Sequence, residues 1–363
     1  MRRSQCPRTQ QRTRKEPQRP QQDARVQHRP RVDDRTPRDI VFGIIGYPAV
    51  LVAHDLQLFT VLAAQPQTLA EVCTALHIAR RPAEAFLAIC ASLDLVQLHE
   101  GQYRLTPLAE DYFLPESPTY FGGYWDLMIA NYSMYSFASL KQAILTDTPQ
   151  AYSGGDVYRS HDEQADRARA FTRAMHSASM GAGLAWPDVI DLSRHQLLLD
   201  IGGGSGCHAI GAALRWPHLH AMVLKFAPVC EVAAEFIVHY GLQGRIRTHV
   251  GDMWQEPFPA ADLHFYSGIY QNWPLEAEGR TLTRKNFESL TSGGRLIIHD
   301  MLYNDDKTGP FPAAAQSINM LLWIKGQQHS GQEITAMLRE AGFTDIEVTP
   351  TFGYWSIVTG RKP

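Results

Sequence analysis

The chain has 363 residues, which is enough for two domains and a sizeable hydrophobic core. Apolar residues make up 44% of it and charged residues 20%, the proportions of a soluble globular protein, and the formal net charge of −3 gives no overall reason to expect nucleic acid as a partner. No uninterrupted apolar run reaches the roughly 18 residues of a membrane span, and the amino terminus lacks the apolar core of a secretory signal. We therefore predict a cytoplasmic protein without a membrane partner.

Five cysteines are scattered through the chain without the paired spacing that is typical of metal sites. Free thiols in a reducing compartment are the simplest interpretation of this pattern. The sequence therefore predicts neither a disulfide framework nor a metal site.

Residues 1–38 are rich in arginine, glutamine and proline and carry almost no large apolar side chains. Such a segment cannot bury enough surface to offset the entropy lost on ordering, so we predict a disordered, basic tail. Nucleic-acid binding through its arginines is the alternative, and a solvated extension is the preferred interpretation.

Residues 39–115 have the pattern of a winged-helix-like domain. An apolar helical pattern covers residues 39–63, and a Ser/Thr–x–x–Glu capping box at Thr68 opens the next helix. A further helix is predicted over residues 81–95, with Pro82 near its start, and residues 96–106 alternate around a glycine turn as a hairpin does. Residues 83–90 of this helix, the part that would be the recognition helix, are apolar and almost uncharged, which favours a protein–protein surface over DNA.

Residues 116–190 are predicted to be mostly helical and to contribute to a substrate site. The aromatic stretches 120–125 and 131–137 suit either an apolar pocket or ordinary helix packing. The last helical stretch, 171–180, contains Met175 and His176, which we take as candidate substrate-lining residues.

A glycine-rich loop follows an apolar, strand-like run at residues 197–201 that contains Asp200. Its alternating glycines are Gly202, Gly204 and Gly206. Glycines allow a sharp turn and a close approach of the backbone to a ligand, and the helix that follows offers free N–H groups. The dinucleotide-binding pattern requires a third glycine at position 207, which is Cys207, so this fingerprint is not met.

Residues 191–363 alternate between strand and helix patterns, which predicts a doubly wound α/β sheet of seven strands. After the first strand, the remaining strands are predicted over residues 221–225, 246–250, 262–267, 295–301, 345–349 and 354–360. The helices are predicted over residues 228–240, 275–290, 313–324 and 331–341. Only four residues separate the last two strands, so we expect them to form a hairpin with one antiparallel strand.

Several stretches, in order, resemble the S-adenosylmethionine-dependent small-molecule O-methyltransferases typified by caffeic acid and acetylserotonin O-methyltransferases. They are residues 200–206, 251–254, 272–274, 292–295 and 319–322, together with the winged-helix-like front. The resemblance extends from about residue 40 to the carboxyl terminus. It implies a methyltransferase fold and a homodimer formed through residues 39–115.

The resemblance also assigns roles to individual residues. Asp200, Gly202 and Gly204 would hold the methionine end of S-adenosylmethionine. Asp252 and Met253 would contact its adenine end, and Trp273 would stack on the adenine ring. Asn319 and Met320, with Met175 and His176, would line the site of a small-molecule acceptor. As ordinary core residues, Asp252 and Trp273 would also make sense.

Three positions depart from the family pattern. Lys225 replaces the acidic residue that holds the ribose hydroxyls, and an ammonium group has only donors to offer them. Gln271 replaces the histidine that serves as the catalytic base, and an amide does not accept a proton near neutral pH. Of the two acidic residues that orient this histidine, Asp300 is kept and the other is replaced by Gln328.

Three explanations for these departures remain open. The acceptor can be acidic enough to arrive deprotonated, so that proximity and in-line geometry supply much of the rate. Another histidine (His176, His299 or His329) can serve as the base. Alternatively, the protein is an inactive or non-methylating relative. We predict O-methylation of a small, aromatic, hydroxylated molecule, and a winged-helix DNA-binding regulator is the remote alternative.

Overall fold

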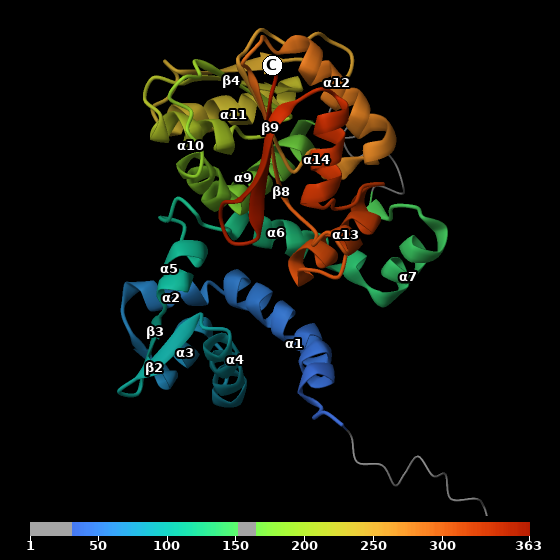
Figure 1. The fold of residues 1–363 in the computed structure, drawn as a ribbon. Coiled ribbons are helices and arrows are strands. Elements are labelled where there is room, and N and C mark those ends of the chain that lie inside the picture. Colours follow the sequence, from blue (N-terminus) through green and yellow to red (C-terminus); the bar gives the residue numbers. More distant parts are fainter. Residues whose placement is uncertain (1–30, 152–164) are drawn as a thin grey trace, which may run out of the picture. The chain divides into compact units, whose positions relative to one another are not determined.

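The computed structural model describes residues 31–151 and 165–363 (Figure 1), so most of the predicted tail lies outside the described residues. The chain divides into two compact units, residues 1–47 and 48–363, and helix α1 (Arg35–Asp55) runs through this boundary. Because α1 already begins at Arg35, the predicted tail is too long by four residues at its carboxyl end.

Helix α1 is apolar as well as long. Its mean hydropathy reaches 1.2 in an 18-residue window, so by length and composition alone it meets the criterion for a membrane span. This helix differs from the predicted absence of a membrane span, because Arg38 and Asp39 interrupt its apolar run. One helix of this kind near an amino terminus is weak support for a membrane. Four apolar side chains on successive turns of α1 are exposed: Ile40, Val41, Ile44 and Ile45.

The helices and strands of the amino-terminal part follow the predicted winged-helix-like order. They are α2 (Leu58–Ala64), β1 (Gln67–Thr68), α3 (Leu69–Leu76), α4 (Arg80–Ser92), β2 (Val96–His99) and β3 (Gln102–Leu105). The small sheet has the order β1–β3–β2. The single helix predicted over residues 39–63 is wrong, because Gln57 adopts a left-handed conformation (φ 57°) that separates α1 from α2.

The capping box and the hairpin turn that the sequence predicted for this part are both present. The Thr68 hydroxyl accepts a hydrogen bond from the backbone N–H of Glu71, and the Glu71 carboxylate accepts one from the backbone N–H of Thr68. Both halves of the capping box are therefore present. Positive φ angles at Glu100 (50°) and Gly101 (78°) close the β2–β3 hairpin, as two-residue turns between twisted strands require.

Helices connect this part to the large sheet. They are α5 (Pro107–Phe113), α6 (Gly122–Ala130), η2 (Tyr132–Tyr135), α7 (Phe137–Thr146), α9 (Ala165–Ala185) and η4 (Trp186–Asp188). This agrees with the mostly helical character predicted for the described residues between 116 and 190.

The large sheet has seven strands, as predicted. They are β4 (Leu197–Ile201), β5 (His220–Lys225), β6 (Ile246–Val250), β7 (Leu263–Ser267), β8 (Arg295–Met301), β9 (Thr344–Pro350) and β10 (Trp355–Arg361). Their order is β6–β5–β4–β7–β8–β10–β9, with β10 antiparallel to both of its neighbours and the other pairs parallel. The predicted hairpin therefore supplies the antiparallel strand.

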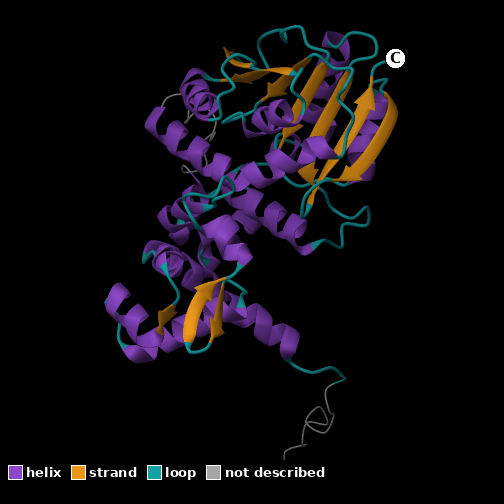
Figure 2. Cartoon of the chain, turned by 90° about the vertical axis from the view of Figure 1, so that its left-hand side faces the viewer, coloured by secondary structure: helices purple, strands orange, loops and turns teal. Residues whose placement is uncertain are grey.

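Helices cover both faces of this sheet, which makes it doubly wound (Figure 2). The helices after β4 are α10 (Cys207–Arg215), α11 (Ala227–His239), η5 (Tyr270–Asn272), η6 (Leu275–Gly279), α12 (Arg280–Ser289), α13 (Phe311–Trp323) and α14 (Gly331–Glu340). The helix predicted over 275–290 begins with the π-helical turn η6 before α12 continues it.

Alternate residues of each strand enter two separate hydrophobic cores. Leu198 of β4 packs into the core beneath α10 and α11, whereas Leu199 packs into the core beneath α12 and α14. The same alternation along β8 places Ile297 in the first core and Ile298 in the second. A residue's position along its strand therefore decides which helix layer it meets.

Two glycines bring α9 and α10 into close contact. A Cβ atom on Gly211 would lie 1.9 Å from the carbonyl oxygen of Gly183, and one on Gly183 would lie 3.0 Å from that of Cys207. Any side chain at Gly211 would therefore push the two helix backbones apart.

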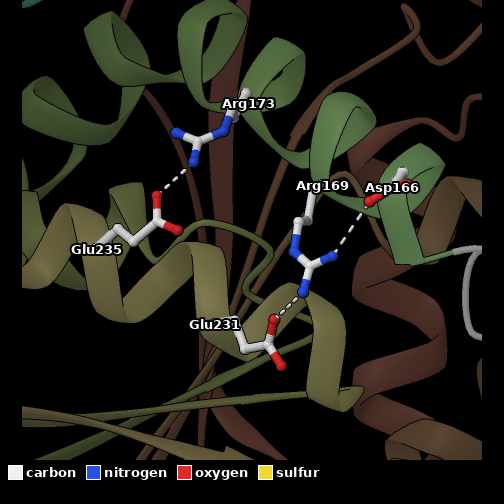
Figure 3. Close-up of polar contacts among 5 residues, drawn as sticks. All are labelled: Asp166, Arg169, Arg173, Glu231 and Glu235. Atoms are coloured by element: carbon white, nitrogen blue, oxygen red, sulfur yellow. Dashed lines mark hydrogen bonds and ion pairs between the residues drawn. The ribbon is translucent and has the colours of Figure 1, made fainter.

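Ion pairs join α9 to α11 along one side of this packing (Figure 3). Arg169 pairs with Glu231 and Arg173 with Glu235, so both helices use residues four positions apart, and Arg169 also reaches Asp166 at 3.3 Å. These side chains are partly exposed, so each pair contributes modestly to stability. Their effect is to fix the register of α9 on α11.

The contact at Gly211 predicts a stability effect. Gly211→Ala should lower the free energy of unfolding by about 1–3 kcal/mol, because the added methyl group overpacks a backbone contact. Thermal and denaturant unfolding would measure this loss. Gly244→Ala is the matched control, since a Cβ atom there meets nothing within 4 Å. Equal stability of the two variants would contradict the close contact of α9 and α10.

Candidate active site

The carboxyl ends of the central parallel strands bring the predicted cofactor residues to one edge of the sheet. The Gly202 N–H donates to Leu224 at 3.0 Å, and the Gly251 N–H donates to Lys225 at 3.1 Å. Lys225 is the last residue of β5 and pairs with Val250 of β6. The prediction that Lys225 ends the second strand of the large sheet is therefore correct.

The glycine loop leaves β4 through residues that need positive φ. Gly202 has φ 74°, and a Cβ atom there would lie 2.6 Å from the side chain of Ile269, so only glycine fits. Gly204 has φ 54°, and a Cβ atom there would meet nothing within 4 Å. The loop is thus packed tightly at its base and open at its tip, as a backbone that approaches a ligand must be.

Asp200 lies beneath this loop with a fully buried carboxylate. Its oxygens have no partner within hydrogen-bond geometry among the described residues, although the backbone N–H of Ala209 faces the carboxylate, and a Cβ atom on Gly203 would lie 2.4 Å from its Cγ. Burial raises the pKa of Asp200 to about 7, an effect that the backbone N–H of Ala209 partly opposes. A buried, unpaired carboxyl group beside an open glycine loop fits a ligand that carries a positive charge.

His176 of α9 supports the loop from its other side. Its Nδ1 lies 2.9 Å from the hydroxyl of Ser205, and its ring stacks on Phe236 with centroids 3.5 Å apart. Burial lowers the pKa of His176 to about 4. These contacts allow His176 to position the loop and disfavour its acting as a base. The preceding residue, Met175, is half-buried.

The segment after β6 brings Asp252, Met253 and Trp273 together. The carboxylate of Asp252 accepts from the backbone N–H of Trp254 at 2.8 Å, and Met253 is buried. The indole of Trp254 meets that of Trp273 edge to face, with centroids 4.9 Å apart. Lys285 of α12 donates to the carbonyl of Met253 at 2.6 Å.

Sequence reasoning missed Trp254 and Lys285 as members of this cluster. Trp254 stands inside the stretch 251–254 that carried the resemblance, so its aromatic character was the available signal. Lys285 lies far away in sequence on an ordinary amphipathic helix, and no sequence signal marks it.

Gln271, at the predicted base position, belongs to an amide pair. Its Nε2 donates to the carbonyl of Gly268 at 3.2 Å, while its Oε1 accepts from Nε2 of Gln328 at 2.5 Å. Gln328 is buried, and its backbone N–H donates to the hydroxyl of Ser317 at 2.9 Å. The backbone of Gln271 is also fixed, because its carbonyl accepts from the Gln327 N–H at 2.8 Å.

Asp300 of β8 is the third predicted member of this group. It is buried, and the backbone N–H groups of Met301 and Gln271 face its carboxylate. Burial raises the pKa of Asp300 to about 7, although both N–H groups act against the shift. The structure thus brings together the three residues for which catalytic roles were predicted.

The alternative histidines lie elsewhere. His299 points to the sheet face opposite Asp300, and both of its ring nitrogens are engaged, with the hydroxyls of Ser267 at 3.2 Å and Thr351 at 3.0 Å. Burial lowers the pKa of His329. The carbonyls of Trp273 and Tyr270 face its ring and partly oppose this lowering of the pKa. Neither ring is arranged as an exposed base.

Asn319 of α13 contacts the aromatic segment η2 rather than Met175 or His176. The hydroxyl of Tyr135 donates to Oδ1 of Asn319 at 3.2 Å and accepts from the indole N–H of Trp323 at 3.0 Å. Met320 is buried. Among the described residues no hydrogen bond links these two pairs of predicted substrate residues. Helix α9 approaches α13 through Phe171, whose ring centroid lies 6.4 Å from that of Trp323.

A cavity of about 290 Å³ lies away from this edge of the sheet, among apolar side chains that include Val50, Leu95, Phe113 and Trp125. Its lining contains no candidate catalytic residue. The strand ends and the amide pair, rather than cavity volume, therefore mark the candidate active site.

Comparisons with known proteins identify the family of this chain. A family model for the O-methyltransferase domain matches residues 137–344, and one for the O-methyltransferase dimerisation domain matches residues 39–114. A 3-hydroxy-5-methyl-1-naphthoate 3-O-methyltransferase of Streptomyces sahachiroi is 33% identical over 309 residues, which cover 85% of this chain and 89% of that protein. The tetracenomycin polyketide synthesis 8-O-methyl transferase TcmO of Streptomyces glaucescens is 28% identical over 340 residues, covering 92% of this chain and 99% of that protein.

Solved structures share the same fold. Human N-acetylserotonin methyltransferase in complex with S-adenosylmethionine superposes with a TM-score of 0.78 at 24% identity, covering 92% of this chain and 99% of that one. The S-adenosylmethionine-dependent methyltransferase SibL in its apo form gives a TM-score of 0.74 at 25% identity, with coverage of 91% and 100%. The family model covers more than half of the chain, and the resemblance predicted from the motifs is confirmed. The chain belongs to the family of S-adenosylmethionine-dependent O-methyltransferases.

Proposed function

We propose that this enzyme transfers a methyl group from S-adenosylmethionine to a hydroxyl oxygen of a small, fused aromatic molecule of the naphthoate or polyketide type. Two relatives that match most of the chain are named for such substrates. The aromatic and amide side chains that α13 and η2 bring together, with Tyr135 bonded to Asn319, support a flat acceptor that carries oxygen atoms.

The observation that carries the cofactor assignment is the buried, unpaired carboxyl group of Asp200 beneath the open tip of the glycine loop. We assign the methionine end of S-adenosylmethionine to this loop, with Asp200, Gly202 and Gly204. The segment with Asp252 and Met253 would contact the adenosine part, and the indole of Trp273 would stack on adenine. When bound, S-adenosylmethionine supplies an electrophilic methyl group on a positively charged sulfur.

The contribution of the protein would be to hold the acceptor oxygen in line with that methyl group and to exclude water. Gln271, Gln328 and Asp300 would lie on the acceptor side of the site. The acceptor site would be lined directly by Met175, Asn319 and Met320. His176 would shape this site indirectly, by supporting the glycine loop.

We also propose a homodimer. The match to the dimerisation domain supports it, and so does the exposed apolar row on α1 with Ile40, Val41, Ile44 and Ile45. A second protein chain accounts for this row without a membrane. Residues 83–90 of helix α4, in which Glu84 is the one charged side chain, likewise suit a protein surface better than DNA.

An inactive or non-methylating relative is the second candidate, because Gln271 occupies the position of the base. Incubation with labelled S-adenosylmethionine and a panel of naphthols and hydroxynaphthoates tests both candidates. Methylated product from an aromatic hydroxyl group supports the transferase. Absence of product from every acceptor, together with tight binding of the cofactor, would instead support the relative without transfer activity.

Lys225 predicts an effect on cofactor affinity. Lys225→Asp should tighten binding of S-adenosylmethionine about five-fold, because a carboxylate accepts hydrogen bonds from both ribose hydroxyls, a gain of about 1 kcal/mol. Isothermal titration calorimetry with S-adenosylmethionine and S-adenosylhomocysteine would measure it. Lys141→Asp, at an exposed residue, is the control for the altered net charge. Unchanged or weaker binding of the cofactor by Lys225→Asp would count against placing the ribose beside residue 225.

Asp200 predicts a pH dependence of stability. Because burial raises its pKa to about 7 from 3.8, the folded protein holds a proton that the unfolded chain releases, so stability falls as the pH rises from about 4 to 7. Asp200→Asn removes this ionisation and should reduce the fall, by about 1.4 kcal/mol for each unit of pKa shift. Thermal unfolding of the cofactor-free protein at several pH values would show it, with the exposed change Asp111→Asn as control. Identical pH profiles for the native protein and Asp200→Asn would rule out the shift.

A further inference from the structure

The amide of Gln271 has a defined orientation. The carbonyl of Gly268 accepts from Nε2 of Gln271 at 3.2 Å and from Nδ2 of Asn272 at 3.3 Å. A rotated amide would bring Oε1 of Gln271 toward this carbonyl, and two acceptors would then face each other. The nitrogen of Gln271 therefore lies beside Gly268, and its oxygen lies beside Gln328.

This orientation leaves one Nε2 hydrogen of Gln271 free to donate, while its oxygen already accepts one hydrogen bond from Gln328 and keeps a second lone pair. Its Oε1 already accepts from Nε2 of Gln328, and one Nε2 hydrogen is used by Gly268. Among the described residues, no acceptor takes the second Nε2 hydrogen. A group that binds here would meet an N–H donor, whereas the base of a proton-abstracting enzyme presents a lone pair to the acceptor hydroxyl.

Neighbouring elements do not supply the missing base on this side. Asp300 of β8 is buried, and its carboxylate faces the backbone N–H groups of Met301 and Gln271. The ring of His329 is buried beside Glu333 and the carbonyls of Trp273 and Tyr270, and its Nε2 has no hydrogen-bond partner among the described residues, so it is closed to solvent rather than exposed as a base. Helix α13 carries no charged side chain, and Lys325 just beyond it is exposed.

We propose that the acceptor binds as an oxyanion and that the free Nε2–H of Gln271 donates a hydrogen bond to the reacting oxygen. This inference rests on the proposed function and narrows its substrate class to phenols or enols that are ionised near neutral pH. The oxyanion forms the new O–C bond with the methyl carbon, the C–S bond breaks, and its electron pair stays on sulfur. No proton moves in this step, so no base is needed.

The inference gives Gln271 a defined part in the reaction. A hydrogen bond to the charged form of a phenol favours that form, so the pKa of the acceptor should fall when it binds. The fixed amide pair also holds the donor in place before the acceptor arrives, which avoids reorganisation during the reaction. Gln328 is then a positioning residue, because it occupies the oxygen of Gln271.

The pH dependence of kcat/KM with a series of substituted naphthols of graded acidity tests the proposal. Below the pKa of each naphthol, kcat/KM should fall tenfold for each pH unit, and the break should move with the naphthol. A break at one pH for every naphthol would overturn the proposal, since it would reveal a base on the protein. Loss of that break in Asp300→Asn would then identify the base as Asp300.

Substitutions of Gln271 separate a donor from a structural role. Gln271→Ala should lower kcat/KM for acidic naphthols about 10- to 100-fold, because one hydrogen bond to an anion is lost. Gln271→His should raise the rate with weakly acidic naphthols up to about 100-fold and add a break set by the enzyme. Gln332→Ala, on the exposed side of α14, is the matched control and should leave every rate unchanged.

Absorbance of a bound chromogenic probe gives a readout that does not depend on turnover. With S-adenosylhomocysteine present, 4-nitrophenol should bind as its coloured phenolate at a pH below its pKa in solution, and Gln271→Ala should reverse this shift. Binding of the neutral phenol, or the same shift in Gln271→Ala, would overturn the proposal. If no naphthol is methylated at any pH, both the proposed function and this inference fail, whereas methylation with an enzyme-set break rejects the inference alone.

Discussion

Parallel pairing of β4 with β5 and β7 is the constraint on which the rest of the structure depends. Because parallel strands end at the same edge, the segments that follow them meet there although they lie far apart in sequence. Gly202 and Gly251 anchor two of these segments through backbone hydrogen bonds to β5. The predicted cofactor residues lie near the carboxyl end of β4, at the end of β5, or after β6 and β7, so the candidate site is a consequence of the topology.

Two buried carboxyl groups sit on opposite faces of this sheet. Asp200 lies under the glycine loop, on the face covered by α10 and α11, and Asp300 lies on the face covered by α12 and α14. Burial raises both pKa values to about 7. A positively charged ligand stabilises the ionised form of such a group, so binding and ionisation should be coupled at Asp200.

The amide pair changes the chemistry that the same framework can perform. At the position where the resemblance implies an imidazole base, the amide of Gln271 offers no group that takes up a proton near neutral pH, and its oxygen accepts from the amide of Gln328. Under the proposed mechanism the site would work without a base on the protein, and the ionisation of the acceptor would limit the reaction. The acidity of the substrate, rather than its shape alone, would then set the specificity.

The sequence by itself determined the architecture and the strand-end positions, because short continuous apolar runs and glycine turns are local signals. Strands β6 and β8 have the predicted bounds, and the order of the motifs along the chain was enough to locate Lys225 and Gln271. Other features depended on tertiary contacts: the break at Gln57, the pairing of Trp254 with Trp273, and the use of His176 to support Ser205. The sequence also could not show which way the amide of Gln271 faces. Its orientation depends on Gly268 and Gln328, and only folding brings Gln328 to it.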